Sequence, residues 1–399
     1  MSSNIRIVCS AGMPLAAEAF GTLGEVTVLE GRNISREDLK SADILAIRST
    51  TRVDRALLEG TPVKFAGTAT IGCDHMDTAY LHGSGIRWCH SPGCNANSVS
   101  EYVAAALLCL GRKFGRSLSG CTMGIIGVGN VGSLVADKVR ALGMRLILND
   151  PPRQRAGRTE GNENFTDLNT LLKESDIVSM HVPLTRDGTD ATWHMADAGF
   201  FSRMKTNSFF LNSARGSVVE TDSLLEAMSR GAPAAAVIDT WEGEPHIRRD
   251  LLETADVATP HIAGYSYDGK VNGTVMVYIQ ACKFLGVEPE WSPEPFLPEP
   301  AVPEIEITGK LPSAENGMAR ETFLREVVGR IYDIESDDRL LRESSAGNIG
   351  ERFDRLRRNY PVRREFQFTR LLLPETDHPS ALAAGALGFQ VQAGGVEGD

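Results

Sequence analysis

The amino-acid sequence predicts an α/β protein with two doubly wound, Rossmann-like domains and a small C-terminal α+β domain. Two series of short apolar segments alternate with helical patterns, over residues 5–92 and 121–261. Such alternation is typical of parallel sheets whose strands are connected by helices. A proline-rich, acidic segment, 287–304, separates both series from the C-terminal part, and this composition favours an extended, semi-rigid linker.

The first series begins with a strand, followed by a helical pattern over 14–24. Its strands are expected at 5–10, 25–31, 43–50, 63–70 and 86–92. A long apolar helix over 98–114 then leads to the second series. Its position between the two series predicts a connector between domains.

The second series opens with CTMGIIGVGNVG, residues 121–132. Further strands are expected at 146–150, 176–184, 208–214, 235–241 and 256–261, with helices at 132–143 and 221–231. A helix over 269–286 returns towards the first series. Beyond the linker we expect an antiparallel sheet, with strands at 304–309, 365–374 and 389–392 and helices at 321–334, 349–360 and 381–388.

The bulk properties exclude several classes of protein. The formal net charge is -11, whereas a general nucleic-acid binder needs a basic face. No run approaches about 20 apolar residues, so no membrane span is expected. The seven cysteines are scattered and contain no C-x-x-C pair. Reduced thiols in a cytoplasmic protein, with no metal site, are the simplest interpretation.

Three glycines, Gly127, Gly129 and Gly132, follow the G-x-G-x-x-G spacing. The motif alone is a weak signal, but here a strand precedes it and a helix follows, as the dinucleotide-binding fingerprint requires. The first glycine permits a tight turn, the second lets the backbone approach a pyrophosphate, and the third allows close packing. The N-terminus of the following helix adds N–H donors for the phosphates.

Asp150 ends the next predicted strand, about 20 residues beyond the motif, where a carboxylate binds the ribose hydroxyls of a dinucleotide. A carboxylate there repels a 2′-phosphate, which favours NAD over NADP. Arg153 and Arg155 follow closely and weaken this preference. The alternative is that Asp150 is only a turn residue before Pro151.

Chemically active side chains follow three strands of the second series. Arg215 lies in NSARGSVVE, Glu244 in DTWEGEP and His261 in TPHIAGY. Open α/β sheets bind ligands outside the carboxyl ends of their strands. Oxidation of a 2-hydroxy acid requires a base for the hydroxyl proton, a role that His261 can fill. Glu244 can orient that histidine and Arg215 can bind the substrate carboxylate, although each residue alone also has a structural explanation.

These motifs, GVGNVG, NSARG, DTWEGEP and TPHIAGY, resemble the D-2-hydroxyacid dehydrogenase family. The resemblance implies an NAD-dependent oxidoreductase with Arg215, Glu244 and His261 as its catalytic residues. It also implies a substrate domain split around an inserted cofactor domain. The expected division is 1–99 with 265–286 for the substrate domain, 100–264 for the NAD domain, 287–303 for the linker and 304–392 for the C-terminal domain.

A closer resemblance rests on AIRSTTRVD, KFAGTATIGCDHMD, SPGCNANSVSEYV and FDRLRRNYPVRREF. These stretches are similar to the subfamily that oxidises 4-phospho-D-erythronate to (R)-3-hydroxy-2-oxo-4-phosphooxybutanoate in vitamin B6 synthesis, and whose C-terminal domain forms a homodimer. The resemblance implies substrate contacts by Arg48, Ser49, Thr70 and Tyr265. It implies cofactor contacts by Asn130, Val131, Val182, Ser213, Ala214, Asp239 and Gly264. Val182 stands where a small polar residue is more usual, so its contact would be through the backbone.

Two other functions stay open at this point. A dehydrogenase of the 3-phosphoglycerate type would use the C-terminal domain for regulation. An NAD(H)-sensing corepressor or scaffold could keep the same three catalytic residues. The C-terminal arginines, Arg355, Arg357, Arg358, Arg363 and Arg364, are most simply a solvated helix face. Alternatively, one of them reaches across a dimer to the substrate phosphate.

Overall fold

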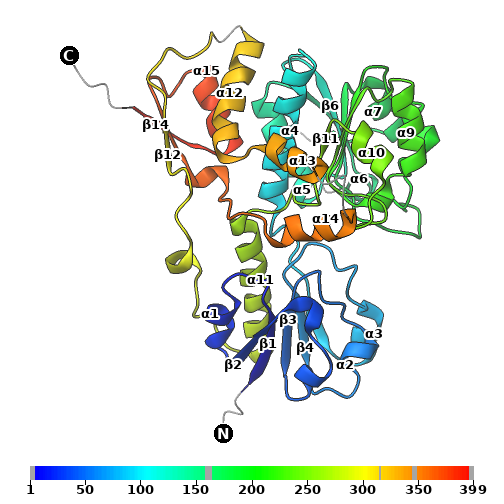
Figure 1. Cartoon of the computed structure of the whole chain (residues 1–399), viewed down its shortest axis with the longest axis vertical. Helices are drawn as coiled ribbons and strands as arrows, with labels where there is room; N and C mark the ends of the chain where they lie inside the picture. The colour runs from blue at the N-terminus through cyan, green and yellow to red at the C-terminus, as the bar shows by residue number, and fades with distance from the viewer. Residues whose placement is uncertain (1–4, 158–163, 314–315, 344–347, 395–399) are drawn as a thin grey trace. The chain divides into compact units, whose positions relative to one another are not determined.

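The computed structural model describes residues 5–157, 164–313, 316–343 and 348–394 (Figure 1). The chain forms two compact units, residues 1–96 with 265–299 and residues 97–264 with 300–399. The second unit therefore contains both the nucleotide-type sheet and the C-terminal segment. None of the helices in the described ranges is long and apolar enough to span a membrane.

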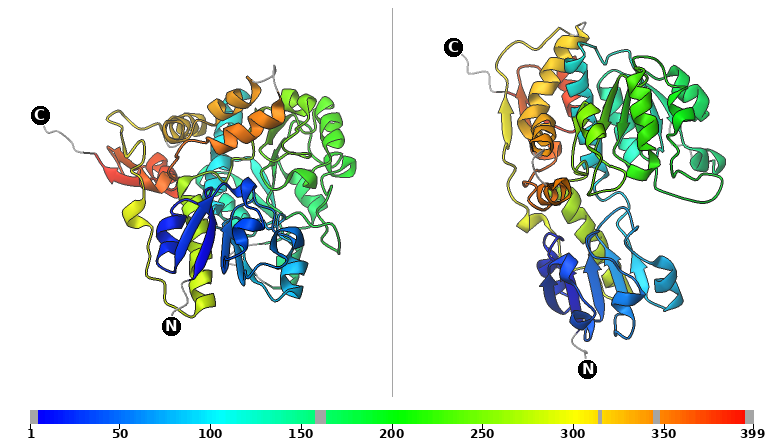
Figure 2. Two further views of the ribbon diagram at one scale, coloured as in Figure 1. Left: turned by 60° about the horizontal axis from the view of Figure 1, so that its bottom comes forward. Right: turned by 45° about the vertical axis from the view of Figure 1, so that its right-hand side comes forward.

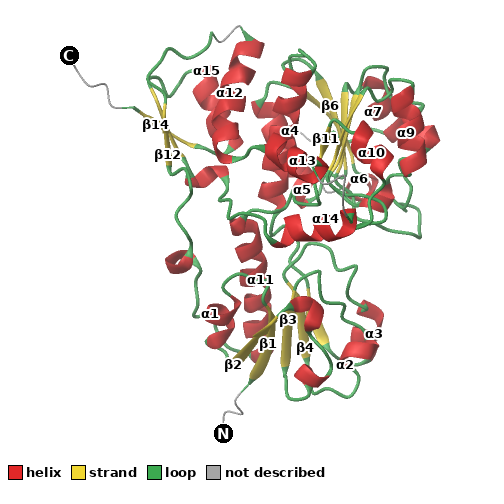
Figure 3. Ribbon diagram, in the orientation of Figure 1, coloured by secondary structure: helices red, strands yellow, loops and turns green. Residues whose placement is uncertain are grey.

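The first unit is built on a five-stranded parallel sheet in the order β2-β1-β3-β4-β5 (Figure 3). Its elements are β1 (Arg6–Ser10), α1 (Ala16–Gly21), β2 (Glu25–Leu29), β3 (Ile44–Ile47), α2 (Arg55–Leu58), β4 (Phe65–Thr68), α3 (Thr78–Gly83), β5 (Arg87–Cys89) and α11 (Tyr267–Leu285), with short 3-10 turns at Gly31–Asn33, Glu37–Leu39 and Glu294–Phe296. Helix α11 lies against β4, where a Cβ on Gly67 would come within 2.3 Å of Val277. Only glycine permits this close packing of helix on sheet.

The second unit contains a six-stranded parallel sheet in the order β11-β10-β9-β8-β6-β7. The chain enters through α4 (Ala96–Lys113) and continues as β6 (Thr122–Ile126), α5 (Asn130–Ala141), β7 (Arg145–Asn149), α6 (Pro151–Arg155), α7 (Leu168–Glu174), β8 (Ile177–Met180), α8 (Ala198–Phe201), β9 (Phe209–Asn212), a 3-10 turn (Gly216–Val218), α9 (Thr221–Ser229), β10 (Ala235–Ile238), α10 (Arg249–Thr254) and β11 (Val257–Ala258). Strands β8, β9 and β10 are buried along their whole length, as expected for strands covered on both faces.

The C-terminal segment contains a three-stranded sheet, and the prediction that this sheet is antiparallel is wrong. Its elements are β12 (Glu304–Glu306), α12 (Gly317–Ile331), α13 (Ile334–Arg342), α14 (Ile349–Arg358), a 3-10 turn (Phe366–Phe368), β13 (Arg370–Leu373), α15 (Pro379–Leu387) and β14 (Gln390–Ala393). Strand β13 pairs in parallel with both β12 and β14. Helices separate each strand from the next (Figure 2), and such helical crossovers return the chain in the same direction.

The C-terminal helices share their hydrophobic cores with the nucleotide-type sheet. Leu324 of α12 and Leu387 of α15 belong to the same buried cluster as Val139 of α5. In a second hydrophobic cluster, Phe353 of α14 is completely buried with Trp241, which lies in the loop after β10. Burial of a phenylalanine contributes about 1.5–3 kcal/mol, so these contacts bind the C-terminal segment firmly to the rest of the unit.

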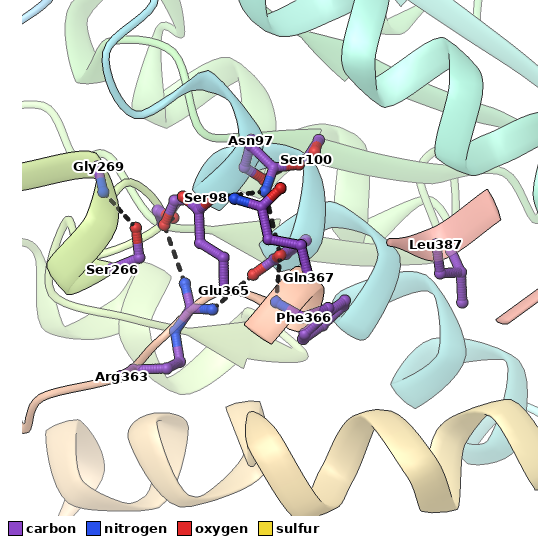
Figure 4. A network of polar contacts seen from close by, with 12 residues as sticks. Asn97, Ser98, Ser100, Ser266, Gly269, Arg363, Glu365, Phe366, Gln367 and Leu387 are labelled. Atoms are coloured by element: carbon purple, nitrogen blue, oxygen red, sulfur yellow. Dashed lines mark hydrogen bonds and ion pairs between the residues drawn. The ribbon is translucent and has the colours of Figure 1, made fainter. Parts of the chain in front are cut away.

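A buried ion pair adds a polar anchor at the same junction. Arg363 donates to the Glu101 carboxylate at 2.7 Å, and the two side chains are only 6% and 0% exposed. Arg363 also donates to the Ser98 hydroxyl at 2.9 Å, as Figure 4 shows. The Phe366 backbone N–H and the Asn97 side-chain amide also donate to Glu101, at 2.8 and 3.2 Å. A carboxylate buried in this way needs several donors to offset its desolvation.

These contacts correct the interpretation of the C-terminal arginines as one solvated helix face. Helix α14 ends at Arg358, so Arg363 and Arg364 lie beyond it. Both are buried, at 7% and 6% exposure, and the Arg364 guanidinium stacks 3.9 Å above the Phe368 ring. Arg363 is bound to Glu101 within its own chain.

Replacing Glu101 with Gln is expected to lower the free energy of unfolding by about 3 kcal/mol. The substitution keeps the shape but leaves the Arg363 charge buried without its anion, which is strongly destabilising. Urea unfolding at pH 7 measures the loss. Glu174→Gln, at the exposed end of α7, is the control and should lie within about 0.5 kcal/mol of wild type. Equal stability of the two variants would show that the ion pair is no anchor.

Candidate active site

The site residues predicted in the second unit follow the carboxyl ends of neighbouring parallel strands. Gly127 follows β6, Asp150 follows β7, Val182 follows β8 and Asp239 follows β10. The segment Ser213–Arg215 comes directly after β9, and His261 comes three residues after β11. Since all six strands are parallel, these residues lie along one edge of the sheet, the edge at which open α/β sheets bind their ligands.

The glycine-rich turn fits a bound pyrophosphate. Gly127 has φ +85° and its backbone lies against His181, so a Cβ there would come within 2.8 Å of the His181 carbonyl. A Cβ on Gly132 would lie 2.0 Å from the Gly127 oxygen. At Gly129, which caps α5, a Cβ would meet no heavy atom within 4 Å. The turn is therefore closely packed at Gly127 and Gly132 and has free space at Gly129. This space lies at a helix N-terminus, which is suited to anions.

Asn130 and Val131 begin helix α5 beside this turn and are exposed and half-buried, respectively. The Ser213 hydroxyl, after β9, is a buried oxygen with no hydrogen-bond partner among the described residues. Neighbouring Ala214 donates its N–H to the Asn212 side chain at 3.1 Å. An unsatisfied buried hydroxyl at a ligand-binding edge is compatible with a group that arrives with the ligand.

Asp150 is both a turn residue and a candidate ribose ligand. Its carboxylate accepts the Val128 N–H at 2.9 Å and the Arg153 N–H at 3.0 Å, which caps helix α6. A carboxylate has about four lone-pair positions, so two acceptor positions can still serve ribose hydroxyls. The Arg153 guanidinium donates to the Val128 carbonyl and lies over the Phe165 ring, while Arg155 forms an ion pair with Asp190.

His261 and Glu244 form a hydrogen-bonded pair. The Nδ1 atom of His261 lies 2.7 Å from Oε2 of Glu244. Because a carboxylate only accepts, the proton between them belongs to Nδ1, and Nε2 can take a proton from a ligand. The other Glu244 oxygen accepts the Trp241 N–H at 2.6 Å. Burial raises the pKa of Glu244, but the charge and hydrogen bond of His261, the Trp241 amide and the charge of Arg357 together hold it below its ordinary value.

The backbone that carries His261 is held by Asp239. His261 adopts φ +55°, a left-handed conformation that is uncommon for residues with a side chain. The buried Asp239 carboxylate accepts from the Thr259 hydroxyl at 2.6 Å and from the Ile262 and Ala263 amides at 2.7 and 3.0 Å. Burial raises the pKa of Asp239. In this structure the Asp239 carboxylate therefore supports the loop, and its predicted contact with the cofactor stays a prediction.

Arg215 lies where two loops approach closely. Its Nη1 donates to the Ala214 carbonyl at 2.8 Å, and its own carbonyl accepts from Asn212 at 3.1 Å. A Cβ on the next residue, Gly216, would lie 1.9 Å from the Trp241 oxygen. Only glycine allows the NSARG turn to pack against the loop that carries Glu244.

The first unit gathers its predicted residues at the carboxyl edge of its own sheet. Arg48 and Ser49 follow β3, and Thr70 follows the neighbouring strand β4. The Thr70 hydroxyl is bonded to Thr68 and to the Gly72 carbonyl, both at 2.8 Å. The Arg48 guanidinium lies 5.9 Å from the Tyr265 ring centre.

Sequence reasoning missed several residues that support these groups. Asn212, which shapes the NSARG turn, and Gly350 of α14, where a Cβ would come within 2.7 Å of the His246 ring, are examples. A second histidine–carboxylate pair joins His194 to Glu242 at 2.6 Å. Lys270 lies within the predicted helix 269–286, and only the structure places it 4.3 Å from the Tyr265 ring. Asn212 and Glu242 lie inside the NSARG and DTWEGEP motifs, whereas no local motif marks Gly350, His194 or Lys270.

Comparisons with known proteins agree with this geometry. Residues 108–263 match the model of the D-isomer specific 2-hydroxyacid dehydrogenase NAD binding domain, and residues 296–384 match a domain of unknown function designated DUF3410. A D-lactate dehydrogenase from Aquifex aeolicus, solved with NAD and lactic acid, is 26% identical with a TM-score of 0.59, covering 70% of this chain and 96% of that chain. A Thermus thermophilus protein, TT0316, is 26% identical with a TM-score of 0.63, covering 72% and 99%.

The fold and the site thus define an NAD-dependent D-2-hydroxyacid dehydrogenase. Erythronate-4-phosphate dehydrogenase of Salinibacter ruber is 43% identical over 369 residues, which is 92% of this chain and 93% of that protein. The enzyme of the same name from Proteus mirabilis is 40% identical over 386 residues, covering 96% and 99%. The chain belongs to the erythronate-4-phosphate dehydrogenase family, and the resemblance predicted from its motifs is confirmed. The roles of individual site residues stay predictions.

Between pH 7 and pH 5, the contribution of His181 to the free energy of unfolding is expected to fall by about 2 kcal/mol. Burial lowers the pKa of His181 to about 3. The unfolded chain binds this proton near pH 6.5 and the folded chain does not, so the stability is complete above about pH 6.5 and declines as the pH falls.

Urea unfolding of wild type and His181→Asn at pH 5, 6 and 7 measures this contribution. The variant should lose about 2 kcal/mol less than wild type over the range. The same substitution at exposed His82 is the matched control. Identical pH dependence in wild type and His181→Asn would contradict the burial of a neutral imidazole.

Proposed function

We propose that this protein oxidises 4-phospho-D-erythronate at C2, with NAD as the hydride acceptor, to (R)-3-hydroxy-2-oxo-4-phosphooxybutanoate, and that it does so in the cytoplasm for vitamin B6 synthesis. The observation that carries the proposal is the His261–Glu244 pair at 2.7 Å, on the same sheet edge as the glycine-rich turn. The 43% identity to a relative named for this reaction supports the choice of substrate.

The chain's own residues have distinct roles in this reaction. The Nε2 atom of His261 accepts the proton of the C2 hydroxyl as the carbonyl forms. Glu244 fixes the tautomer of His261 and stabilises the imidazolium that results. Arg215 binds the substrate carboxylate and orients C2. NAD, when bound, accepts the hydride that leaves C2.

The cofactor would be held by the glycine-rich turn and by the neighbouring strand ends. Gly127, Gly129, Gly132, Asn130 and Val131 would bind the pyrophosphate, and Asp150 would bind the ribose hydroxyls. The remaining proposed contacts are Val182, Ser213, Ala214, Asp239 and Gly264. Arg48, Ser49, Thr70 and Tyr265 of the first unit would bind the substrate.

We also propose that the C-terminal segment forms a homodimer. Two large apolar side chains of its helices, Met318 and Leu382, are 50% and 60% exposed, and Val362 is 57% exposed. The outer strands β12 and β14 have free edges within the three-stranded sheet. Exposed apolar side chains and sheet edges of this kind are features that a partner surface would cover.

Purified protein incubated with NAD is expected to convert 4-phospho-D-erythronate to its 2-oxo product, detected by mass spectrometry. Product detection also registers turnover when the reduced cofactor stays bound to the protein. 3-Phosphoglycerate, offered in a parallel reaction, tests the related dehydrogenase activity. Product from 3-phosphoglycerate alone would overturn the substrate, and product from neither compound would overturn the proposed reaction.

Replacing His261 with Asn is expected to reduce kcat by about 10²- to 10⁴-fold, the usual contribution of a general base. Binding of NADH, measured by fluorescence titration, should change little because the glycine-rich turn is untouched. His82→Asn, at an exposed position of α3 in the first unit, is the matched control. Full turnover by His261→Asn would remove this residue from the mechanism.

A further inference from the structure

The loop after β10 carries two histidine–carboxylate pairs, and the proposed reaction uses only one of them. Glu244 is bonded to His261 at 2.7 Å. Glu242, two residues earlier in the chain, is bonded to His194, whose Nε2 lies 2.6 Å from Glu242 Oε1. Because a carboxylate only accepts, the proton between His194 and Glu242 belongs to Nε2.

The carboxylate of Glu242 is held through both of its oxygens. While Oε1 is bonded to His194, Oε2 accepts from the Thr221 hydroxyl at 3.0 Å and from the Thr221 backbone N–H at 3.4 Å. Burial raises the pKa of Glu242, but the hydrogen bonds from His194 and Thr221 and the charge of His194 hold this pKa below its ordinary value. Both oxygens have partners, which leaves Glu244 as the carboxylate bonded to His261.

His194 is itself held by its backbone and by its ring. Its backbone adopts the left-handed conformation with φ +51°, and its N–H donates to the Ser217 carbonyl at 2.8 Å. The imidazole ring stacks on the ring of Trp193, with the two ring centres 3.9 Å apart. A residue with a side chain keeps a left-handed backbone only where the surrounding contacts determine it. The position of His194 is therefore fixed before Glu242 binds to it.

The pair joins three loops at the carboxyl edge of the six-stranded sheet. His194 lies in the loop after β8, Ser217 in the turn after β9 and Glu242 in the loop after β10. Arg215 lies two residues before Ser217, and Glu244 lies two residues after Glu242. The residue proposed to bind the substrate carboxylate and the residue proposed to orient the base are thus attached to one hydrogen-bonded junction.

Gly243, between the two acids, shows why this junction matters. Its backbone has φ +79°, and a Cβ there would come no closer than 3.6 Å to its nearest neighbour, the His246 carbonyl oxygen. Glycine has the most freedom of any residue in the backbone, and close packing does not restrict it here. The hydrogen bonds of Glu242 restrict the chain directly before this flexible position, and so limit the movement of Glu244.

We propose that His194 and Glu242 are positioning residues, which act through the loops that carry Glu244 and Arg215. This inference rests on the proposed function, in which Glu244 orients His261. A displacement of about 1 Å in a group that orients a reacting residue can cost about 10²-fold in rate. The pair supports kcat because it keeps the Glu244 carboxylate at the Nδ1 atom of His261.

The test measures kcat for 4-phospho-D-erythronate in His194→Asn, Glu242→Ala and Glu242→Gln. Asn tolerates the left-handed backbone at position 194 but lacks the ring nitrogen that reaches Glu242. We expect kcat to fall about 10- to 100-fold in His194→Asn and Glu242→Ala, with little change in the Kd for NADH. Glu242→Gln should recover most of the activity, since its side-chain carbonyl still accepts from His194. Glu226→Ala, which removes an exposed ion pair with Arg230 on α9, is the matched control.

A spectroscopic measurement separates this proposal from the proposed function. In protein labelled with ¹⁵N-histidine, the Nδ1 proton of His261 should give an NMR signal downfield of the backbone amides, identified by its loss in His261→Asn. The signal should broaden or disappear in His194→Asn and Glu242→Ala, and persist in Glu242→Gln and Glu226→Ala. If wild type does not turn over the substrate but the signal depends on the pair, the reaction is wrong and the positioning role stands.

Other outcomes overturn the positioning role. Wild-type kcat in both His194→Asn and Glu242→Ala, an unchanged His261 signal in these variants, or the absence of that signal from wild type would each contradict it. An equal fall of kcat in Glu242→Gln and Glu242→Ala would contradict positioning by a hydrogen bond. Circular dichroism and thermal melting should match wild type in every variant, and a general loss of the fold would make the pair a structural support instead.

Discussion

The geometry of the loop that carries His261 depends on the buried carboxylate of Asp239. This carboxylate accepts hydrogen bonds from three donors of the following loop, the Thr259 hydroxyl and the amides of Ile262 and Ala263. These hydrogen bonds lie on both sides of His261 in the chain. They hold His261 in its left-handed backbone conformation, which is unfavourable for a residue with a side chain. The hydrogen bond from His261 to Glu244 therefore follows from a constraint that neither residue provides, and a change at Asp239 would act through the backbone and not through the proton transfer.

The residues that could be predicted from the sequence are those whose signal is local. The spacing of Gly127, Gly129 and Gly132 depends on the backbone conformation of only six consecutive residues. The structure shows the expected close contacts at Gly127 and Gly132. Arg215, Glu244 and His261 could be placed because each follows a recognisable strand of a parallel sheet. Parallel pairing then brings them to one edge without any further information.

The features that could not be predicted depend on contacts between segments distant in sequence. In the sequence Arg363 resembles the surface arginines before it. In the folded chain α4 places Glu101 beside it, and the buried ion pair connects the C-terminal segment to α4. The direction of β12, β13 and β14 is set by the helices between them, whereas strands of three or four residues carry no signal of their own for pairing direction. The closeness of Lys270 and Arg48 to the Tyr265 ring likewise arises only in the folded chain.

These long-range contacts also explain why the C-terminal segment belongs to the catalytic unit. Phe353 of α14 is buried with Trp241 and Ile247, on either side of Glu244 in the chain, and Gly350 lets the same helix approach His246. The Trp241 amide donates to Glu244, and its indole N–H donates to the Thr259 carbonyl. Packing of α14 therefore acts on the residue that links the Glu244 loop to the His261 loop. A segment that is separate in sequence thereby limits the freedom of both members of the proposed proton-transfer pair, so its loss would disturb the proposed chemistry even where it touches no substrate.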